Sequence, residues 1–358
     1  MAQTSSSSLE RATMVGRAVV KWGVIVLVVM IVGRVVVSAL ISFWKATHPP
    51  APEPPTVGFG MLPAIALLNQ AGAQPASYSL ELPTGKFPSF SDRAKVFFIP
   101  QGGASLLSDQ QAKEKASRYD FVFEPEKIGQ NSYRWTKSQP LGSTLEMNII
   151  TYQLRITTDF MSRPELTANP QLPDSFGAVQ LVKSFLNTGN LLPADVATSS
   201  GTIEYQKLIG GVLKPAVSVS DAEFIQVDLN RAPIDDTYYM YTPLGTVGTI
   251  HAILSGALSG NSAIVHLDYN YFPVDYYQVY TYPIRTPQSA WEILQAGEGY
   301  VVPSFAGEEA AIRSVELGYF DNFAYQPYLQ PIYVFLGDEG FIGYVSAIDQ
   351  SYIQPTPK

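Results

Sequence analysis

A membrane-length apolar segment near the N-terminus constrains this chain most. Residues 22–44 are almost all apolar and have Trp22 and Trp44 at their ends, but Arg34 interrupts them near the middle. As a helix the segment would be about 35 Å long, enough to cross the hydrocarbon core of a bilayer with some tilt. Tryptophans at both ends are typical of membrane–water interfaces. The segment therefore predicts a single N-terminal transmembrane helix whose first partner is the lipid bilayer.

The charge of Arg34 opposes insertion without outweighing it. An arginine at mid-membrane costs about 2.5–3.5 kcal/mol, whereas the surrounding apolar side chains together contribute about 4–8 kcal/mol. On a helix, Ser38 lies one turn after Arg34 on the same face. Two explanations stay open. Arg34 and Ser38 either contact the span of a membrane-protein partner or a second copy of this chain, or Arg34 simply reaches the headgroups.

Basic residues set the orientation of the segment. Residues 1–21 contain Arg11, Arg17 and Lys21, whereas Lys45 alone follows the span closely. The positive-inside rule makes this N-terminal part a cytoplasmic tail and places residues 45–358 outside.

A cleaved signal peptide is the alternative to an anchor. Residues 37–39 read Val-Ser-Ala, which resembles a cleavage site with the cut after Ala39. The chain nevertheless stays apolar as far as Trp44, which favours the uncleaved anchor.

Composition narrows the location and the partners. The chain has no cysteine, which excludes disulfides, thiolate metal sites and a cysteine nucleophile, and is compatible with an exported bacterial protein. We therefore expect a bacterial cytoplasmic membrane as the location. After residue 45 the chain holds 18 Lys/Arg and 30 Asp/Glu. Such an acidic body repels a phosphate backbone, so we expect no nucleic-acid partner.

Local patterns predict an α+β fold of antiparallel sheets with a few packed helices. A capping-box pattern at Ser108, an apolar helical spacing over 176–186 and a Thr-Pro step at Thr286 predict three helices. Each is followed by segments typical of strands. Two hairpins are predicted, one turning near residues 259–261 and one at residues 338–340.

The same patterns divide the chain into five parts. A Pro-rich stretch predicts an extracytoplasmic spacer, although Met61–Ala73 is apolar and is expected to pack on the body. The predicted parts are a tail (1–21), a transmembrane helix (22–44), the spacer (45–75), a first α+β module (76–165) and a larger α+β ectodomain (166–358).

Longer patterns in the body carry a resemblance to known families. Residues 105–160 and 286–349 resemble PepSY-type modules, in which a helix packs on a small antiparallel sheet. Residues 220–350, with "YPIRTPQSAWEILQAG" and "LQPIYVFLGD", are similar to the ectodomains of YycH/YycI-type regulators. The resemblance implies a single-span protein that holds an extracytoplasmic α+β body against a two-component histidine kinase. No binding residue is carried over, because the shared pattern is structural.

No catalytic signature stands out. His251 and His266 fall on two predicted paired strands, with Asp268 on the same face as His266. We interpret them as satisfied strand residues, because a metal or acid–base site needs two or three converging ligands. Asp235–Asp236 and residues 337–340 resemble half of a calcium loop and are interpreted as solvated turns. We therefore expect no enzyme activity, no catalytic residue, no cofactor and no metal.

Tyrosine is concentrated in the last third of the chain. Residues 232–358 hold 16 of the 21 tyrosines, and 13 acidic against three basic residues. One explanation of this bias is sheet packing, because tyrosine suits half-buried sheet surfaces. The other explanation is a binding face, densest in the predicted loop 319–331, where Tyr319, Tyr325 and Tyr328 would contact a partner.

The sequence thus predicts a membrane-anchored, non-enzymatic envelope protein that binds or regulates a membrane or envelope partner. The alternative is a tethered module that binds a glycan or peptide through a tyrosine-rich acidic face.

Overall fold

The computed structural model describes residues 6–47, 54–65, 74–139, 141–168 and 170–355. Residues 1–5 of the predicted tail, and 48–53 and 66–73 of the predicted spacer, lie outside the described residues. The chain divides into two units between Pro54 and Pro55, and each unit is described by itself.

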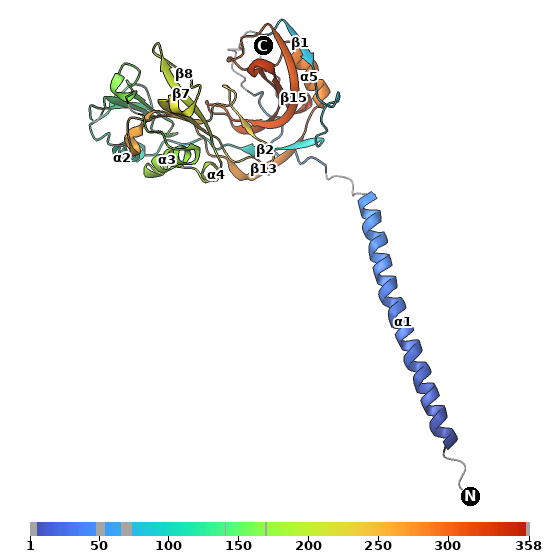
Figure 1. Cartoon of the computed structure of the whole chain (residues 1–358). Coiled ribbons are helices and arrows are strands. Elements are labelled where there is room, and N and C mark those ends of the chain that lie inside the picture. The colour runs from blue at the N-terminus through green and yellow to red at the C-terminus, as the bar shows by residue number, and fades with distance from the viewer. Residues whose placement is uncertain (1–5, 48–53, 66–73, 140, 169, 356–358) are drawn as a thin grey trace. The chain divides into compact units, whose positions relative to one another are not determined.

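The first unit contains one long helix, α1 (Ser6–Thr47), drawn in blue in Figure 1. It begins well before Trp22, so most of the predicted tail is helical. Within it, Thr13–Trp44 is long and apolar enough to cross a membrane, and it is the one such helix among the described residues. Its described side chains are exposed within the unit. The helix is therefore compatible with single-pass anchoring.

The second unit is a mixed α+β body built on two sheets (Figure 1). The larger is a nine-stranded sheet in which every neighbouring pair is antiparallel. In spatial order its strands are β3 (Glu126–Lys127), β4 (Ser132–Lys137), β5 (Ser143–Asn148), β6 (Leu154–Thr158), β12 (Ile264–Tyr269), β11 (Ile250–Ser255), β9 (Phe224–Leu229), β7 (Thr202–Ile209) and β8 (Val212–Pro215).

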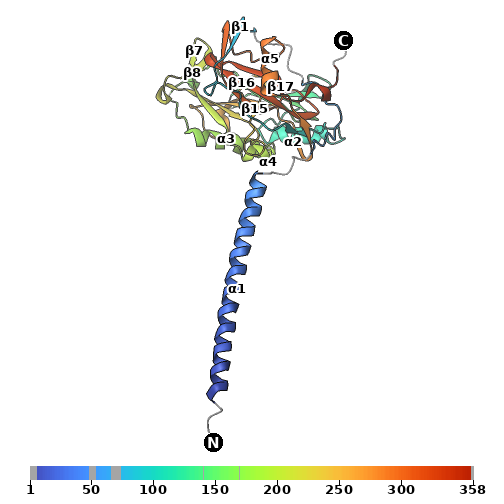
Figure 2. The same ribbon diagram turned by 90° about the vertical axis from the view of Figure 1, so that its right-hand side faces the viewer.

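The second sheet has eight strands and departs from the expected antiparallel arrangement. Its strand β15 pairs in parallel with β1 and with β10, while its other pairs are antiparallel. Figure 2 shows β15, β16 and β17 side by side. The strands are β1 (Ser77–Leu80), β2 (Arg93–Phe98), β10 (Met240–Tyr241), β13 (Asp275–Pro283), β14 (Tyr300–Val301), β15 (Glu309–Phe320), β16 (Tyr328–Gly337) and β17 (Ile342–Ser346).

Four helices pack on the sheets, and three of them were predicted. They are α2 (Ser108–Ser117), α3 (Ser175–Thr188), α4 (Ala194–Ala197) and α5 (Pro287–Gln295). Thr286 caps α5 by accepting a hydrogen bond from the Ser289 backbone N–H, as its Thr-Pro step predicts. The capping box expected at Ser108 is wrong, because Ser108 lies inside α2 and its hydroxyl accepts from the Ser105 N–H instead. Both predicted hairpins form, as β11–β12 and β16–β17.

The main core lies between α2, α3 and one face of the nine-stranded sheet. Alternate strand residues point into it, such as Ile250 and Ala252 of β11 and Leu267 of β12, and they meet Val182 and Phe185 of α3. A second core lies where α5 packs on the eight-stranded sheet. The helices of the first core cover one face of the nine-stranded sheet. Because side chains alternate along a strand, the residues between the core residues point to the opposite face.

The predicted boundary at residue 165 does not separate two modules. Strand β6, from the predicted first module, pairs with β12. Strand β2, from the same predicted module, pairs with β13 and β16 of the other sheet. Residues 76–165 therefore supply strands to both sheets. The sequence could not show this, because each of these pairings joins segments that are far apart in the chain.

The predicted spacer is also shorter than residues 45–75. The Val57 N–H donates to the Thr281 carbonyl (3.1 Å), and the ring of Phe59 contacts that of Tyr280. Leu62 is fully buried, and its N–H and C=O bond to the backbones of Tyr352 and Gln354. The segment 55–65 is thus part of the body, as expected for the start of the apolar stretch Met61–Ala73.

One buried arginine joins the two sheets. Arg231 follows β9, and its side chain is 0% exposed. It donates to Asp195 in α4 (3.0 Å) and to Asp321 after β15 (2.8 Å), as well as to the Phe272 carbonyl. Burial lowers the pKa of the guanidinium, but the carboxylates outweigh it and raise the pKa above its ordinary value.

The packing of segment 55–65 on the body predicts the effect of shortening Leu62. Leu62→Ala should lower the unfolding free energy of the full-length protein by about 2–5 kcal/mol, because it leaves a cavity in a closed cluster. Chemical denaturation measures this. Met61→Ala is the control, because Met61 is 47% exposed. Equal stability of the two variants would mean that the segment is a free spacer.

Two arginines that each bind two carboxylates should differ strongly in their contribution to the unfolding free energy, because one is buried and the other is exposed. Arg231→Ala should cost about 3–5 kcal/mol, because it leaves two carboxylates without their buried partner. Arg313→Ala should cost much less, because Arg313 is 48% exposed in its pairs with Glu81 and Asp338, where solvent screens the charges. Denaturation curves of both variants provide the comparison, and similar losses would contradict the role of Arg231.

Candidate functional site

The open face of the nine-stranded sheet carries a row of charged side chains, one from each of seven neighbouring strands. Strand register places these residues opposite one another, at the roughly 4.8 Å spacing of adjacent strands. We call them the charge row, which consists of Glu126, Arg134, Glu146, Arg155, Asp268, His251 and Asp228.

Oppositely charged neighbours in this row are paired. An Arg134 nitrogen lies 2.7 Å from a Glu146 oxygen and another lies 3.7 Å from Glu126. The Arg155 Nε lies 2.5 Å from Asp268 Oδ1. Opposite charges directly across strands stabilise a sheet face, whereas like charges would destabilise it. The row is therefore consistent with a solvated, well-paired surface.

Both histidines have a carboxylate partner. His251 Nδ1 lies 2.8 Å from Asp228 Oδ1, and His266 Nε2 lies 3.1 Å from Asp268 Oδ2. Because an ionised carboxylate only accepts hydrogen bonds, the ring nitrogen donates in each pair. The two rings are 6.0 Å apart between centroids. The shared face predicted for His266 and Asp268 is thus present, and the register of β11 on β12 brings His251 to it as well.

Sequence reasoning missed two members of this cluster, Asp228 and Arg155. Each comes from a strand distant in sequence, and their available signal was only the alternation of polar and apolar residues along β9 and β6. Asp228 is also held by the Gly248 N–H and the Gln226 amide, both at 2.8 Å. Arg155 stays 60% exposed beyond its contact with Asp268.

The partners of Asp268 change its acidity. Burial alone would raise the pKa of this carboxyl, but hydrogen bonds from His266 and Arg155 outweigh burial and lower the pKa to about 2. Asp268 therefore keeps its negative charge in moderately acidic solution.

An open groove lies over the centre of this face. Its volume is about 410 Å³, and it is lined by Arg155, Asp268 and both histidines together with apolar side chains. A second, shallower depression of about 560 Å³ continues it toward β5. The two share Phe160, Met161 and His266, so we treat them as one feature, the sheet groove.

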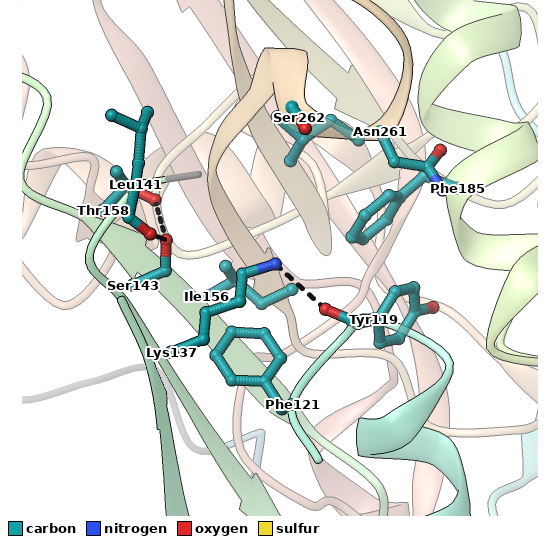
Figure 3. Close-up of a pocket in the computed structure, with 11 residues that line it drawn as sticks. Tyr119, Phe121, Lys137, Leu141, Ser143, Ile156, Thr158, Phe185, Asn261 and Ser262 are labelled. Atoms are coloured by element: carbon teal, nitrogen blue, oxygen red, sulfur yellow. Dashed lines mark hydrogen bonds between the residues drawn. The ribbon is translucent and has the colours of Figure 1, made fainter. Parts of the chain in front are cut away.

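A smaller cavity lies on the helix side of the same sheet (Figure 3). Lys137 points into it, donates to the Tyr119 carbonyl (3.0 Å) and lies 4.7 Å from the centre of the Phe121 ring. Burial lowers the pKa of Lys137. The cavity measures about 30 Å³, room for one or two waters and no larger ligand. We therefore assign it to the packing of the core.

The predicted tyrosine contacts are largely buried. Tyr319 lies in β15, is 2% exposed, and donates its hydroxyl proton to the Lys95 carbonyl. Tyr325 donates to the Ile99 carbonyl and Tyr328 packs on Phe59, and both are half-buried. The expectation of one extended, exposed loop over 319–331 is wrong, because β15 and β16 take up its two ends.

Exposed tyrosines lie elsewhere in the body. Tyr276, Tyr277 and Tyr280 of β13 are 38%, 99% and 40% exposed, and Tyr239 is 59% exposed. The tyrosine bias of the sequence could not separate these from the buried ones, because tyrosine suits both faces of a sheet.

The other sequence candidates are placed as follows. Arg34 and Ser38 are exposed on α1, and the Ser38 hydroxyl donates to the Val35 carbonyl (2.8 Å). Asp235 pairs with Lys95, and Asp338 with Arg313. Within the described part of the chain, no three His, Cys, Asp or Glu side chains are grouped so that they could hold a metal ion.

The lowered pKa of Asp268 predicts a pH dependence. The pKa falls from 3.8 to about 2 on folding, so the carboxylate stabilises the fold above pH 3.8 and loses this effect as the pH falls toward 2. Asp268→Asn should thus cost about 1–2 kcal/mol at neutral pH, after allowance for solvent screening, and almost nothing near pH 2. Denaturation over this range tests it, with the charge-neutral Thr157→Val as control. A loss that does not depend on pH would contradict it.

Comparisons with known proteins add little to this geometry. No protein-family model matches the chain, and no curated protein matches it. A crystal structure of an uncharacterized protein from Eubacterium rectale is similar over 72% of this chain and 84% of that one, with 12% sequence identity and a TM-score of 0.34. This similarity is too distant to support an argument about fold or function.

Proposed function

We propose that this chain is a membrane-anchored protein of a bacterial envelope whose body binds a partner through the sheet groove. The observation that carries the proposal is the groove itself. It joins paired charges with apolar side chains such as Met161 and Leu244, each 47% exposed. Polar groups that fix orientation beside an apolar lining are typical of binding sites.

The anchor sets the location in this proposal. Helix α1 holds the chain in the cytoplasmic membrane, with the N-terminus inside and residues 45–358 outside. The basic residues Arg11, Arg17 and Lys21 support this orientation. The resemblance to YycH/YycI-type regulators supports a membrane protein as the partner.

Binding is favoured over catalysis by the surroundings of the histidines. An activated nucleophile requires a hydroxyl, thiol or amine within hydrogen-bond reach of its base. In the described parts of the body, the hydrogen bonds of His251 and His266 are those to Asp228 and Asp268. We therefore propose a non-enzymatic role.

A tethered module that uses tyrosines is the second candidate function. The observation that favours it is the exposure of Tyr276, Tyr277 and Tyr280 on β13. These side chains offer rigid contact area for a glycan or peptide.

Photo-crosslinking separates these candidates. A photoreactive residue at Met161 in the full-length protein should capture a partner in native membranes, and Thr157→Arg should abolish the adduct by filling the groove. The same probe at Tyr277 is the matched control on β13. An adduct from Tyr277 that persists with Thr157→Arg would favour the tyrosine face, and an adduct from Met161 unaffected by Thr157→Arg would contradict the groove.

The span is tested in the same membranes. Arg34→Leu should preserve insertion, because it removes a cost of about 2.5–3.5 kcal/mol. Crosslinks between spans should fall if Arg34 and Ser38 contact a partner helix. Unchanged crosslinks, with Val36→Leu as control, would leave α1 as an anchor alone.

A further inference from the structure

The sheet groove crosses the strands instead of following one of them. Its lining includes residues of β5, β6, β12 and β11, which are consecutive neighbours in the nine-stranded sheet. Each of these four strands is hydrogen-bonded on both sides. Their backbone groups are already used, so a ligand in the groove is bound by side chains.

Two hydroxyl groups lie side by side on the floor, next to the charge row. Register places Thr144 of β5 opposite Thr157 of β6, and Thr157 opposite His266 of β12. Both threonines line the groove, and neither hydroxyl has a hydrogen bond within the described residues. A ligand therefore meets one hydroxyl that both donates and accepts on β5 and another on β6, about 4.8 Å apart.

The groove carries charges of both signs. Arg155 binds Asp268 through Nε, which leaves its other N–H groups for hydrogen bonds to a ligand. Asp159 is the further acid in the lining, and it accepts from the Ser162 hydroxyl. A polyanion or polycation would meet no matching field of one sign here.

Apolar side chains border the polar floor. Phe160 and Met161 lie along the shared part of the groove, and Leu244, Val247 and Phe323 line its β11 end. Two hydroxyls at strand spacing, charges of both signs and apolar walls together fit a chain with many hydroxyls and apolar C–H faces.

We propose that the sheet groove binds an extended, largely uncharged glycan strand, which lies across β5, β6, β12 and β11. This inference rests on the proposed function and names the chemistry of the partner. A peptide fits less well, because an extended peptide gains its main-chain hydrogen bonds at a free sheet edge. The groove lies away from the edges β3 and β8.

The test uses the full-length protein in detergent micelles and calorimetric titration. The probes are a β-1,4-linked N-acetylglucosamine hexasaccharide, maltohexaose, a heparin hexasaccharide and an uncharged hexapeptide. At least one neutral hexasaccharide should bind more tightly than the heparin fragment and the peptide. Thr144→Val and Thr157→Val should each raise its Kd about two- to tenfold, because each removes one hydroxyl hydrogen bond. Valine keeps the shape and the strand propensity of threonine.

Thr188→Val, on α3 and away from the groove, is the matched control and should leave Kd unchanged. Binding of neither neutral hexasaccharide, or binding that both groove variants leave unchanged, would overturn the glycan assignment. Tighter binding of the peptide would overturn it in favour of a peptide partner. In both cases a Met161 crosslink that Thr157→Arg abolishes would still support the proposed function, so the two failures can be told apart.

Discussion

The relation between the two sheets depends on the buried guanidinium of Arg231. It holds Asp195 of the helical side of the nine-stranded sheet and Asp321 at the end of β15 in the other sheet. The ring of Tyr271 stacks under it at 4.1 Å, and the Tyr271 hydroxyl donates to Asp195. Arginine suits this position because its planar group offers five N–H donors and stays charged. Burial raises the pKa of Asp321 and Arg231 opposes the rise, so the pair fixes geometry at an energetic cost.

The Arg231 junction is connected to the sheet groove by the short loop that follows Asp321. Asp321 begins the loop that contains Phe323, and Phe323 lines the groove. The carbonyl of Phe323 accepts from the Gln153 amide (3.1 Å), just before β6. The groove therefore has one wall from each sheet. Its width depends on how the sheets meet, so in the proposed function a loosened Arg231 junction would weaken binding as well as stability.

The sequence predicted the elements that depend on local signals, and it did not predict the contacts that depend on long-range strand pairing. Helix α5 was predicted from its own residues, because Thr286 caps it and Gly297, with φ +76°, follows its end. The pairing of Arg155 with Asp268 was not, because the register of β6 on β12 joins residues 113 positions apart. The alternation of polar and apolar residues along a strand shows that a side chain faces outward, but it does not show which residue of a neighbouring strand that side chain contacts. Tyr319 was misplaced for a related reason, since a tyrosine that completes a strand and one that faces solvent have the same local sequence signal.

In the proposed function the charge row serves recognition, and its share of the folding free energy is small. Exposed ion pairs such as Arg134 with Glu146 are worth at most about 1 kcal/mol each. The core on the other side of the same strands, around Ile250 and Leu267, carries the stability of the sheet. Because every second residue of a strand faces outward, side chains on the open face can change without disturbing that core. Under the proposed function, substitutions along this face therefore alter what the groove binds before they alter whether the body folds.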